Sequence, residues 1–311
     1  NSTSFNSAKF NSKVHIIKIK GSVTLASSNY TLNNWLNLKV IGGKFIGNGS
    51  SSSSYRLNIA SNMTFVGVEF ENIKIDTASN VRFENCTFKG EISLPFDSII
   101  NNSYFIAADL SNSSRVKKIS NSEIDNSTIL QAIYLINNKI DDSILGESVN
   151  RTNMFTVANI IQNNIDDTLI YLEDNTHLAN NNIEDSFIKI YGRGQITISN
   201  NHIEDSHSSN STEIINIDMS ESAWKAVEIL NNTIIGKTSI TNMINISGGA
   251  SNSYGYSFVR INGNSFLKGT NAISHSGTEP LIVTNNFIKK LSLGVVNNGG
   301  YLRVSNNIDF D

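Results

Sequence analysis

A short strand-and-turn unit recurs along this chain. Residues 196–203 read ITISNNHI: two β-branched residues alternate with polar ones, two asparagines follow, and a third aliphatic residue comes after a spacer. The alternation predicts a short, half-buried strand. The asparagine pair predicts a tight turn, because Asn tolerates the left-handed backbone region better than most residues. The unit returns as VEILNNTI at 227–234, VRINGNSF at 259–266 and LIVTNNFI at 281–288.

The unit can be followed from residue 45 to residue 288. The aliphatic or aromatic residue after each turn serves as an anchor, and successive anchors lie 16 to 32 positions apart. The anchors are Phe45, Phe70, Phe88, Phe105, Ile124, Ile140, Ile165, Ile183, Ile203, Ile234, Phe266 and Ile288. Constant inward positions with variable spacing indicate a solenoid, in which each repeat stacks on its neighbours. Because no period-3.6 stripe and no leucine consensus is present, we predict an all-β fold, a parallel β-helix of about 12 coils.

The residues that carry this pattern also carry a resemblance. The motif Ile/Val-x-Ile-x-Asn-Asn-x-Ile/Phe resembles the right-handed parallel β-helix superfamily typified by pectate lyases, which includes polysaccharide lyases and hydrolases, phage tailspikes and surface adhesins. The resemblance implies an asparagine ladder in the tight turn, where stacked amides would satisfy buried backbone groups. It implies an architecture and no single activity, because the repeat encodes the scaffold.

Composition narrows the classes of function. Asparagine supplies 47 of the 311 residues, yet Ile, Val and Phe recur periodically, which a disordered Asn-rich chain would lack. The net charge is −3 and Lys and Arg are not clustered, so we expect no nucleic-acid partner. No apolar run approaches the ~18 residues of a transmembrane helix, so we expect no membrane insertion. The single cysteine, Cys86, excludes an internal disulfide, and we expect it to be a buried thiol in a turn.

Residues 1–35 lack the repeat, and we assign them to an N-terminal cap and a first strand, HIIKIK at 15–20. We assign residues 36–311 to the parallel β-helix.

Acidic residues follow five of the anchors, and Ser or Thr comes next each time. They are Asp125–Asn126, Asp141–Asp142, Asp166–Asp167, Glu184–Asp185 and Glu204–Asp205. In stacked coils they would form a column, for which three interpretations stay open. It is a solvated turn, a divalent cation site, with Ca²⁺ the best fit to oxygen ligands, or a source of two carboxyls ~5–9 Å apart for glycoside hydrolysis. We take Glu184, Asp185, Glu204 and Asp205 as candidate catalytic residues and assign no metal ligand and, apart from the Ca²⁺ alternative, no cofactor.

Charged and aromatic residues downstream suit a polysaccharide. Lys and Arg beside the acidic column would fit β-elimination on an acidic sugar. The two longest coils must send loops out of the solenoid, and aromatic side chains there could stack on sugar rings. The candidate substrate-binding residues are Lys189, Tyr191, Arg193, Asp218, Glu221, Trp224, Tyr254 and Tyr256.

These observations predict an extracellular, cell-surface or virion β-helix that recognises a polysaccharide or cell-surface glycan. Cleavage by a lyase or hydrolase mechanism with lateral-face carboxylates is one alternative within this prediction. A non-enzymatic adhesin or structural stalk is the other. The resemblance to tailspikes also implies a homotrimer.

Overall fold

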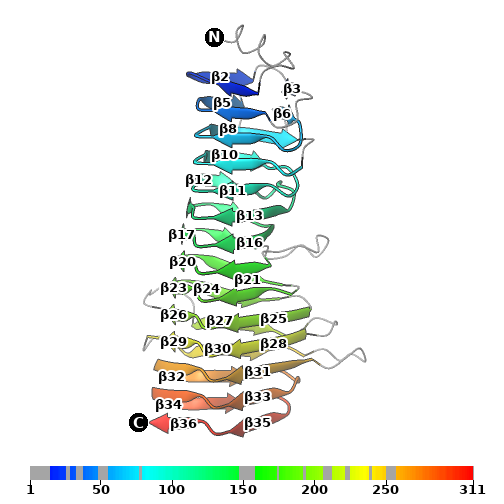
Figure 1. Ribbon diagram of the computed structural model, residues 1–311. Coiled ribbons are helices and arrows are strands. Elements are labelled where there is room, and N and C mark those ends of the chain that lie inside the picture. The colour runs from blue at the N-terminus through cyan, green and yellow to red at the C-terminus, as the bar shows by residue number, and fades with distance from the viewer. Residues whose placement is uncertain are drawn as a thin grey trace. The chain divides into compact units, whose positions relative to one another are not determined.

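The computed structural model consists of strands and turns and shows no helix in the residues that it describes. The described residues are 15–25, 29–32, 38–47, 55–76, 79–146, 158–173, 175–191, 194–205, 212–220, 225–237, 240–249 and 257–310. Within them, no helix is available that could cross a membrane. The chain divides into two compact units, Asn1–Ile144 and Leu145–Asp311. In each unit, successive turns of the chain stack as coils (Figure 1).

The first unit is built from parallel strands that repeat in order. The first strands of its coils pair as one sheet: β1 (Ile16–Lys18), β4 (Lys39–Ile41), β7 (Thr64–Val66), β9 (Arg82–Glu84), β11 (Ile99–Asn101), β13 (Val116–Ser120) and β16 (Ala132–Ile136). The later strands are β2 (Ser22–Leu25), β3 (Asn29–Leu32), β5 (Lys44–Gly47), β6 (Arg56–Ile59), β8 (Glu69–Asp76), β10 (Thr87–Ser93), β12 (Tyr104–Asp109), β14 (Glu123–Asp125), β15 (Thr128–Ile129) and β17 (Lys139–Asp141), with β18 (Ile144–Leu145) at the division between the units. Parallel pairing already starts with β1, which lies inside the segment 1–35 and pairs with β4.

The second unit repeats the arrangement. Its first strands are β19 (Asn159–Ile161), β22 (His177–Ala179), β25 (Gly194–Ser199), β28 (Lys225–Leu230), β31 (Phe258–Asn262), β33 (Leu281–Thr284) and β35 (Leu302–Ser305). Its second strands are β20 (Asn164–Ile165), β23 (Asn182–Glu184), β26 (His202–Glu204), β29 (Thr233–Ile235) and β36 (Ile308–Phe310), and its third strands are β21 (Leu169–Leu172), β24 (Phe187–Ile190), β27 (Glu213–Asp218) and β30 (Asn242–Ser247). The long strands β32 (Ser265–His275) and β34 (Phe287–Asn297) each span the positions of a second and a third strand. These pairings are parallel, which confirms the predicted all-β parallel β-helix.

A two-residue turn joins the first strand of a coil to the second in every described coil from β4–β5 onward, whereas three residues separate β1 from β2. Residues 200–201 lie between β25 and β26, and residues 231–232 lie between β28 and β29. The first turn residue adopts a left-handed conformation, with φ of 56° at Asn200 and 55° at Asn231. Asn and Gly tolerate this conformation, which explains why they dominate the position. The second turn residue points into the coil and is buried in most coils.

In the second unit these buried turn residues are asparagines joined by hydrogen bonds. They are Asn163, Asn181, Asn201, Asn232, Asn264 and Asn286. From Asn181 onward the side-chain Oδ1 accepts the backbone N–H and the Nδ2 group of the preceding asparagine, as Asn232 does from Asn201 at 2.9 Å in both cases. The Nδ2 group of Asn232 donates in turn to the Ile198 and Leu230 carbonyls and to Asn264 Oδ1. The column satisfies backbone groups that would otherwise be buried without partners.

The first unit uses smaller side chains at the same turn position. The backbone N–H of Cys86 donates to Ser103 Oγ, Ser103 N–H donates to Ser122 Oγ, and Ser122 N–H donates to Asn138 Oδ1, at 3.0–3.1 Å. Cys86 is fully buried, and its Sγ lies 3.5 Å from the Phe65 and Glu84 carbonyl oxygens. The cysteine therefore occupies a structural position in a turn.

Burial raises the pKa of the Cys86 thiol to about 12. An ordinary cysteine has a pKa of ~8.5, so at neutral pH the thiolate of the folded protein should be roughly three thousandfold scarcer. We expect Cys86 to resist iodoacetamide in the native protein and to react promptly in urea, as measured by mass spectrometry. Cys86→Ser should remove the labelling and retain the fold, because Ser103 and Ser122 already fill this position. Rapid labelling of the native protein would contradict the buried turn.

The core of the first unit is a stack of phenylalanines. Because Phe45, Phe70, Phe88 and Phe105 are paired in register on neighbouring strands, their rings stack with centroids 4.9–5.8 Å apart. Phe65 and Phe83 enter from the first strands and meet this column edge-on at 5.3–5.6 Å. In the second unit, isoleucine fills most of the equivalent positions.

Candidate functional site

The acidic pairs form the turn between the second and third strands. Asp167 and Asp185, the second members of two pairs, adopt φ of 41° and 45°. The residues after them, Thr168 and Ser186, are buried and donate their hydroxyls to the carbonyls two residues earlier, both at 2.7 Å. Thr168 N–H also donates to Ser186 Oγ at 3.0 Å, which links neighbouring coils. The acidic-acidic-Ser/Thr pattern is therefore explained by turn geometry before any ligand is considered.

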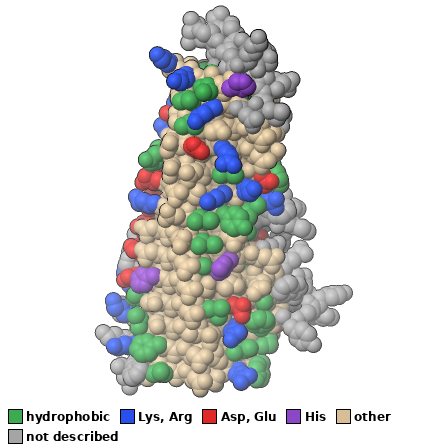
Figure 2. Space-filling model, viewed as in Figure 1, with side chains coloured by type: hydrophobic (Ala, Val, Ile, Leu, Met, Phe, Trp, Pro, Cys, Tyr) green, Lys and Arg blue, Asp and Glu red, His purple; other side chains and the backbone are tan. Residues whose placement is uncertain are grey.

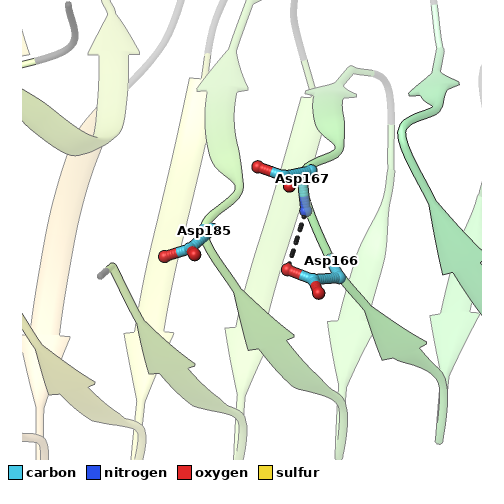
Figure 3. A group of neighbouring side chains, drawn as sticks. All are labelled: Asp166, Asp167 and Asp185. Carbon is cyan, nitrogen blue, oxygen red and sulfur yellow. Dashed lines mark hydrogen bonds between the residues drawn. The ribbon is translucent and has the colours of Figure 1, made fainter. Parts of the chain in front are cut away.

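Three carboxylates nevertheless gather at this turn (Figure 3). Asp166 and Asp167 come from one coil and Asp185 from the next, and an oxygen of each lies within 4.8 Å of the others. Asp166 Oδ1 accepts the Asp167 backbone N–H at 3.0 Å. The group could contribute three oxygens to a divalent cation, whereas Ca²⁺ takes 6–8. A calcium site remains a prediction.

Glu184 and Glu204 occupy directly paired positions on β23 and β26. Ile183 and Ile203 before them point inward and are buried, so the side chains of Glu184 and Glu204 point outward from neighbouring strands, whose backbones lie ~4.8 Å apart. Glu204 Oε2 lies 3.7 Å from His202 Nε2. Asp205 is almost fully buried, and its backbone N–H donates to the Ile235 carbonyl at 2.9 Å.

Around the turn, the third strands present an aromatic and polar surface. Tyr171 on β21 is paired with Lys189 on β24, and the rings of Tyr171 and Tyr191 stack with centroids 5.9 Å apart. Lys189 Nζ lies 4.6 Å from the centre of the Tyr191 ring. All three side chains are half-buried. The Lys189 ammonium is attracted to the quadrupole of the Tyr191 ring, and this attraction helps to hold the ring in place.

Amides continue this row of side chains across the next strands. Asn216 on β27 is paired with Lys189, and Asn245 on β30 is paired with Asn216. The carboxylate of Glu213 accepts the Asn216 Nδ2 group at 2.5 Å and the Asn245 Nδ2 group at 2.7 Å. We call Tyr171, Lys189, Tyr191, Asn216 and Asn245 the tyrosine–amide surface.

Asp218 lies at the end of β27, beside this surface. Burial alone would raise the pKa of its carboxyl, but hydrogen bonds from Ser220 and the charges of Lys225 and Lys189 outweigh burial and lower it. Asp218 Oδ1 accepts the Ser220 N–H at 2.9 Å. The fully buried Lys225 donates its Nζ to the Asp218 carbonyl. Asp218 therefore carries a negative charge within the electrostatic reach of Lys189.

The structure thus brings together some of the residues predicted from sequence. Lys189 and Asp218 lie on the neighbouring third strands β24 and β27, and Tyr191 directly follows β24. Glu184 and Glu204 lie on paired second strands across the turn. Arg193, Glu221, Trp224, Tyr254 and Tyr256 fall outside the described residues.

Tyr171, Asn216 and Asn245 were missed by the sequence reasoning. Tyr171 follows its anchor Ile165 by the same number of residues as Lys189 follows Ile183, so counting from the anchors could have found it.

No family model matches this chain, and no curated protein matches it in sequence. Its fold is similar to that of solved parallel β-helix structures. The tailspike of E. coli bacteriophage HK620 is 13% identical with a TM-score of 0.48, over 95% of this chain and 62% of that one. Tailspike protein 3 of bacteriophage CBA120 is 14% identical with a TM-score of 0.45, over 99% of this chain and 57% of that one. PfbA, a surface adhesin of Streptococcus pneumoniae, is 10% identical with a TM-score of 0.32, over 99% of this chain and 86% of that one. The chain thus spans less than two thirds of the length of either tailspike.

Proposed function

We propose that this protein is a glycan-recognition module, and that the tyrosine–amide surface of its second unit binds a polysaccharide segment. The observation that carries the proposal is the stacked Tyr171–Tyr191 pair with Lys189 held over one ring, continued by two amides. We place the protein outside the cell, on a cell surface or a virion, where it would meet such glycans. A homotrimer remains part of the proposal, and sedimentation analysis would test it.

The chemistry of the surface suits a sugar chain. The apolar faces of pyranose rings stack on aromatic side chains, and hydroxyls are recognised by a few well-placed polar groups. The amide groups of Asn216 and Asn245 are pre-positioned by Glu213. Because the row runs across neighbouring coils, it extends along the direction in which the coils of this unit stack, and an extended polymer could follow it.

A carboxylate mechanism is the second candidate, and the paired positions of Glu184 and Glu204 favour it. Glycosidases place two carboxyls ~5–9 Å apart, and outward side chains on neighbouring strands can reach such a separation. The pair lies across one turn from Lys189 and Tyr191. The turn geometry of Asp185 makes that residue the weaker catalytic candidate.

The test is a glycan array followed by titration of the best ligand. Tyr191→Ala and Tyr171→Ala should each weaken binding roughly tenfold or more, because each removes part of the stacking platform. Tyr104→Ala is the matched control, because Tyr104 lies on the first unit, outside this surface, and has 51% of its surface exposed. Equal affinities for all three variants would overturn the proposal.

Turnover is measured separately, as release of reducing ends or of unsaturated sugars from the bound glycan. Glu184→Gln and Glu204→Gln should abolish turnover and leave binding intact if the carboxyl pair is catalytic. Binding without turnover in the unaltered protein would leave the non-enzymatic adhesin as the function.

A further inference from the structure

One face of the first unit carries four cations that form no ion pair within the part of the chain that the structure describes. The charged residues of β4, β7, β9, β11, β13 and β16 are the four cations Lys39, Arg82, Lys117 and Lys118 and the single carboxylate Glu84. None of the four cations forms an ion pair or side-chain hydrogen bond within the residues described. Blue side chains gather on this face around β9, β11 and β13 (Figure 2).

Strand register places the cations at regular intervals. The outward positions form one row in the order Lys39, Thr64, Arg82, Ile99, Lys118. Cations therefore occur at every second strand, which corresponds to ~10 Å at the usual strand spacing.

A β-bulge adds a fourth cation to the row. The backbone N–H groups of Lys117 and Lys118 both donate to the Ser98 carbonyl, at 2.9 and 3.3 Å. Two residues thus oppose one, and both lysines reach the surface, where Lys117 is exposed and Lys118 half-buried. Without the bulge, strand alternation would turn one of the two toward the core.

The same face is hollowed next to Arg82. An open depression of about 490 Å³ is lined by Asn62, Thr64, Asn80, Arg82, Ile99 and Lys117. Asn62 and Asn80 precede β7 and β9 in left-handed turns, with φ of 62° and 55°. Two cations, two amides and a hydroxyl therefore surround one small apolar patch. This mixture offers charge recognition together with hydrogen bonds to hydroxyls.

We propose that this basic face binds an acidic polysaccharide that carries one negative charge per two sugar units. A spacing of ~10 Å between cations is comparable with the advance of a disaccharide along an extended chain. A nucleic acid presents phosphates far more densely, every ~3.4 Å along each strand of a duplex, and would leave most of its charge unmatched here. The site goes beyond the tyrosine–amide surface and is independent of it, because it lies on the other unit.

The experiment measures binding of hyaluronan, chondroitin and heparosan oligosaccharides, which all alternate acidic and neutral sugars, by isothermal titration calorimetry. Carboxyl-reduced hyaluronan is the matched uncharged ligand, and a single-stranded oligo(dT) represents nucleic acid. We expect at least one alternating polymer to bind, with an affinity that falls as salt rises. The uncharged polymer and oligo(dT) should bind more weakly.

Arg82→Gln and Lys118→Gln should each weaken that binding roughly three- to tenfold. Lys139→Gln is the control with the same loss of charge, because Lys139 lies on β17 with 60% of its side chain exposed. The proposal is overturned if none of the three acidic polymers binds or if the uncharged polymer binds equally well. Tighter binding of oligo(dT), or equal effects of Arg82→Gln and Lys139→Gln, would overturn it as well. Loss of binding to the tyrosine–amide surface would leave these measurements unaffected, so the two proposals can fail separately.

Discussion

Replacing Asn232 by alanine is expected to lower the free energy of unfolding by about 3–5 kcal/mol. Only 1% of Asn232 is exposed, and its side chain joins three coils of the second unit. The substitution would remove the acceptor of the Asn201 N–H and Nδ2 groups and the donor to the Ile198 and Leu230 carbonyls. The two Asn201 groups and the Ile198 carbonyl are buried, so each loses a hydrogen bond that water does not replace. Urea denaturation followed by circular dichroism measures the effect.

The neighbouring residue provides the control. Asn231 belongs to the same turn but is exposed, with φ of 55°. Asn231→Gly keeps the left-handed conformation at no steric cost, so we expect a change within about 1 kcal/mol. If Asn232→Ala were no more destabilising than Asn231→Gly, the hydrogen-bonded column would not be what stabilises the turns.

Replacing Phe70 by alanine should lower the free energy of unfolding by about 3–5 kcal/mol, because it opens a cavity in the core of the first unit. The Phe70 ring is fully buried and meets four others: it stacks on Phe45 and Phe88 and meets Phe65 and Phe83 edge-on. Rings on both sides hold the cavity open, so little relaxation is available to fill it. The same denaturation experiment measures the loss.

Phe96→Ala is the control for this substitution. Phe96 is 45% exposed, and Arg115 lies over its ring with 5.0 Å to the centroid. We expect less than about 1 kcal/mol from its loss. If the Phe70→Ala protein were as stable as the Phe96→Ala protein, the phenylalanine stack would contribute little to the free energy of unfolding.

The fold could be predicted because its two strongest signals are local. The turn residues Asn200 and Asn201 follow a strand with period-2 alternation, and both signals depend only on backbone conformation and burial. The register between equivalent strands then follows, since each coil places its strand and turn residues at the same positions as the coil before it. The different roles of the two turn residues were not predicted. The first is exposed and left-handed, and the second is buried and hydrogen-bonded. Sequence alone does not show which amide turns inward.

The candidate site was harder to predict, because side chains from distant coils create it. The acidic pairs were conspicuous in the sequence, but Asp167 and Asp185 owe their place to the turn and to the buried Thr168 and Ser186. Tyr171 was inconspicuous, although it stacks on Tyr191 twenty positions later. A polar column needed for folding and one needed for binding look alike in sequence.

The two-residue turn also determines where this chain can accept insertions and deletions. From β4–β5 onward the length of the turn is constant in the described coils, because its second residue must reach the turn residue of the next coil. The remaining connections are free of that requirement. The interval between successive hydrogen-bonded turn residues accordingly ranges from 16 positions, at Ser122 to Asn138, to 32 positions, at Asn232 to Asn264. We therefore expect insertions and deletions in the other connections of the coil, outside the turn between the first and second strands. New surface loops can be inserted there, in evolution or by design, without changing the packing of the core.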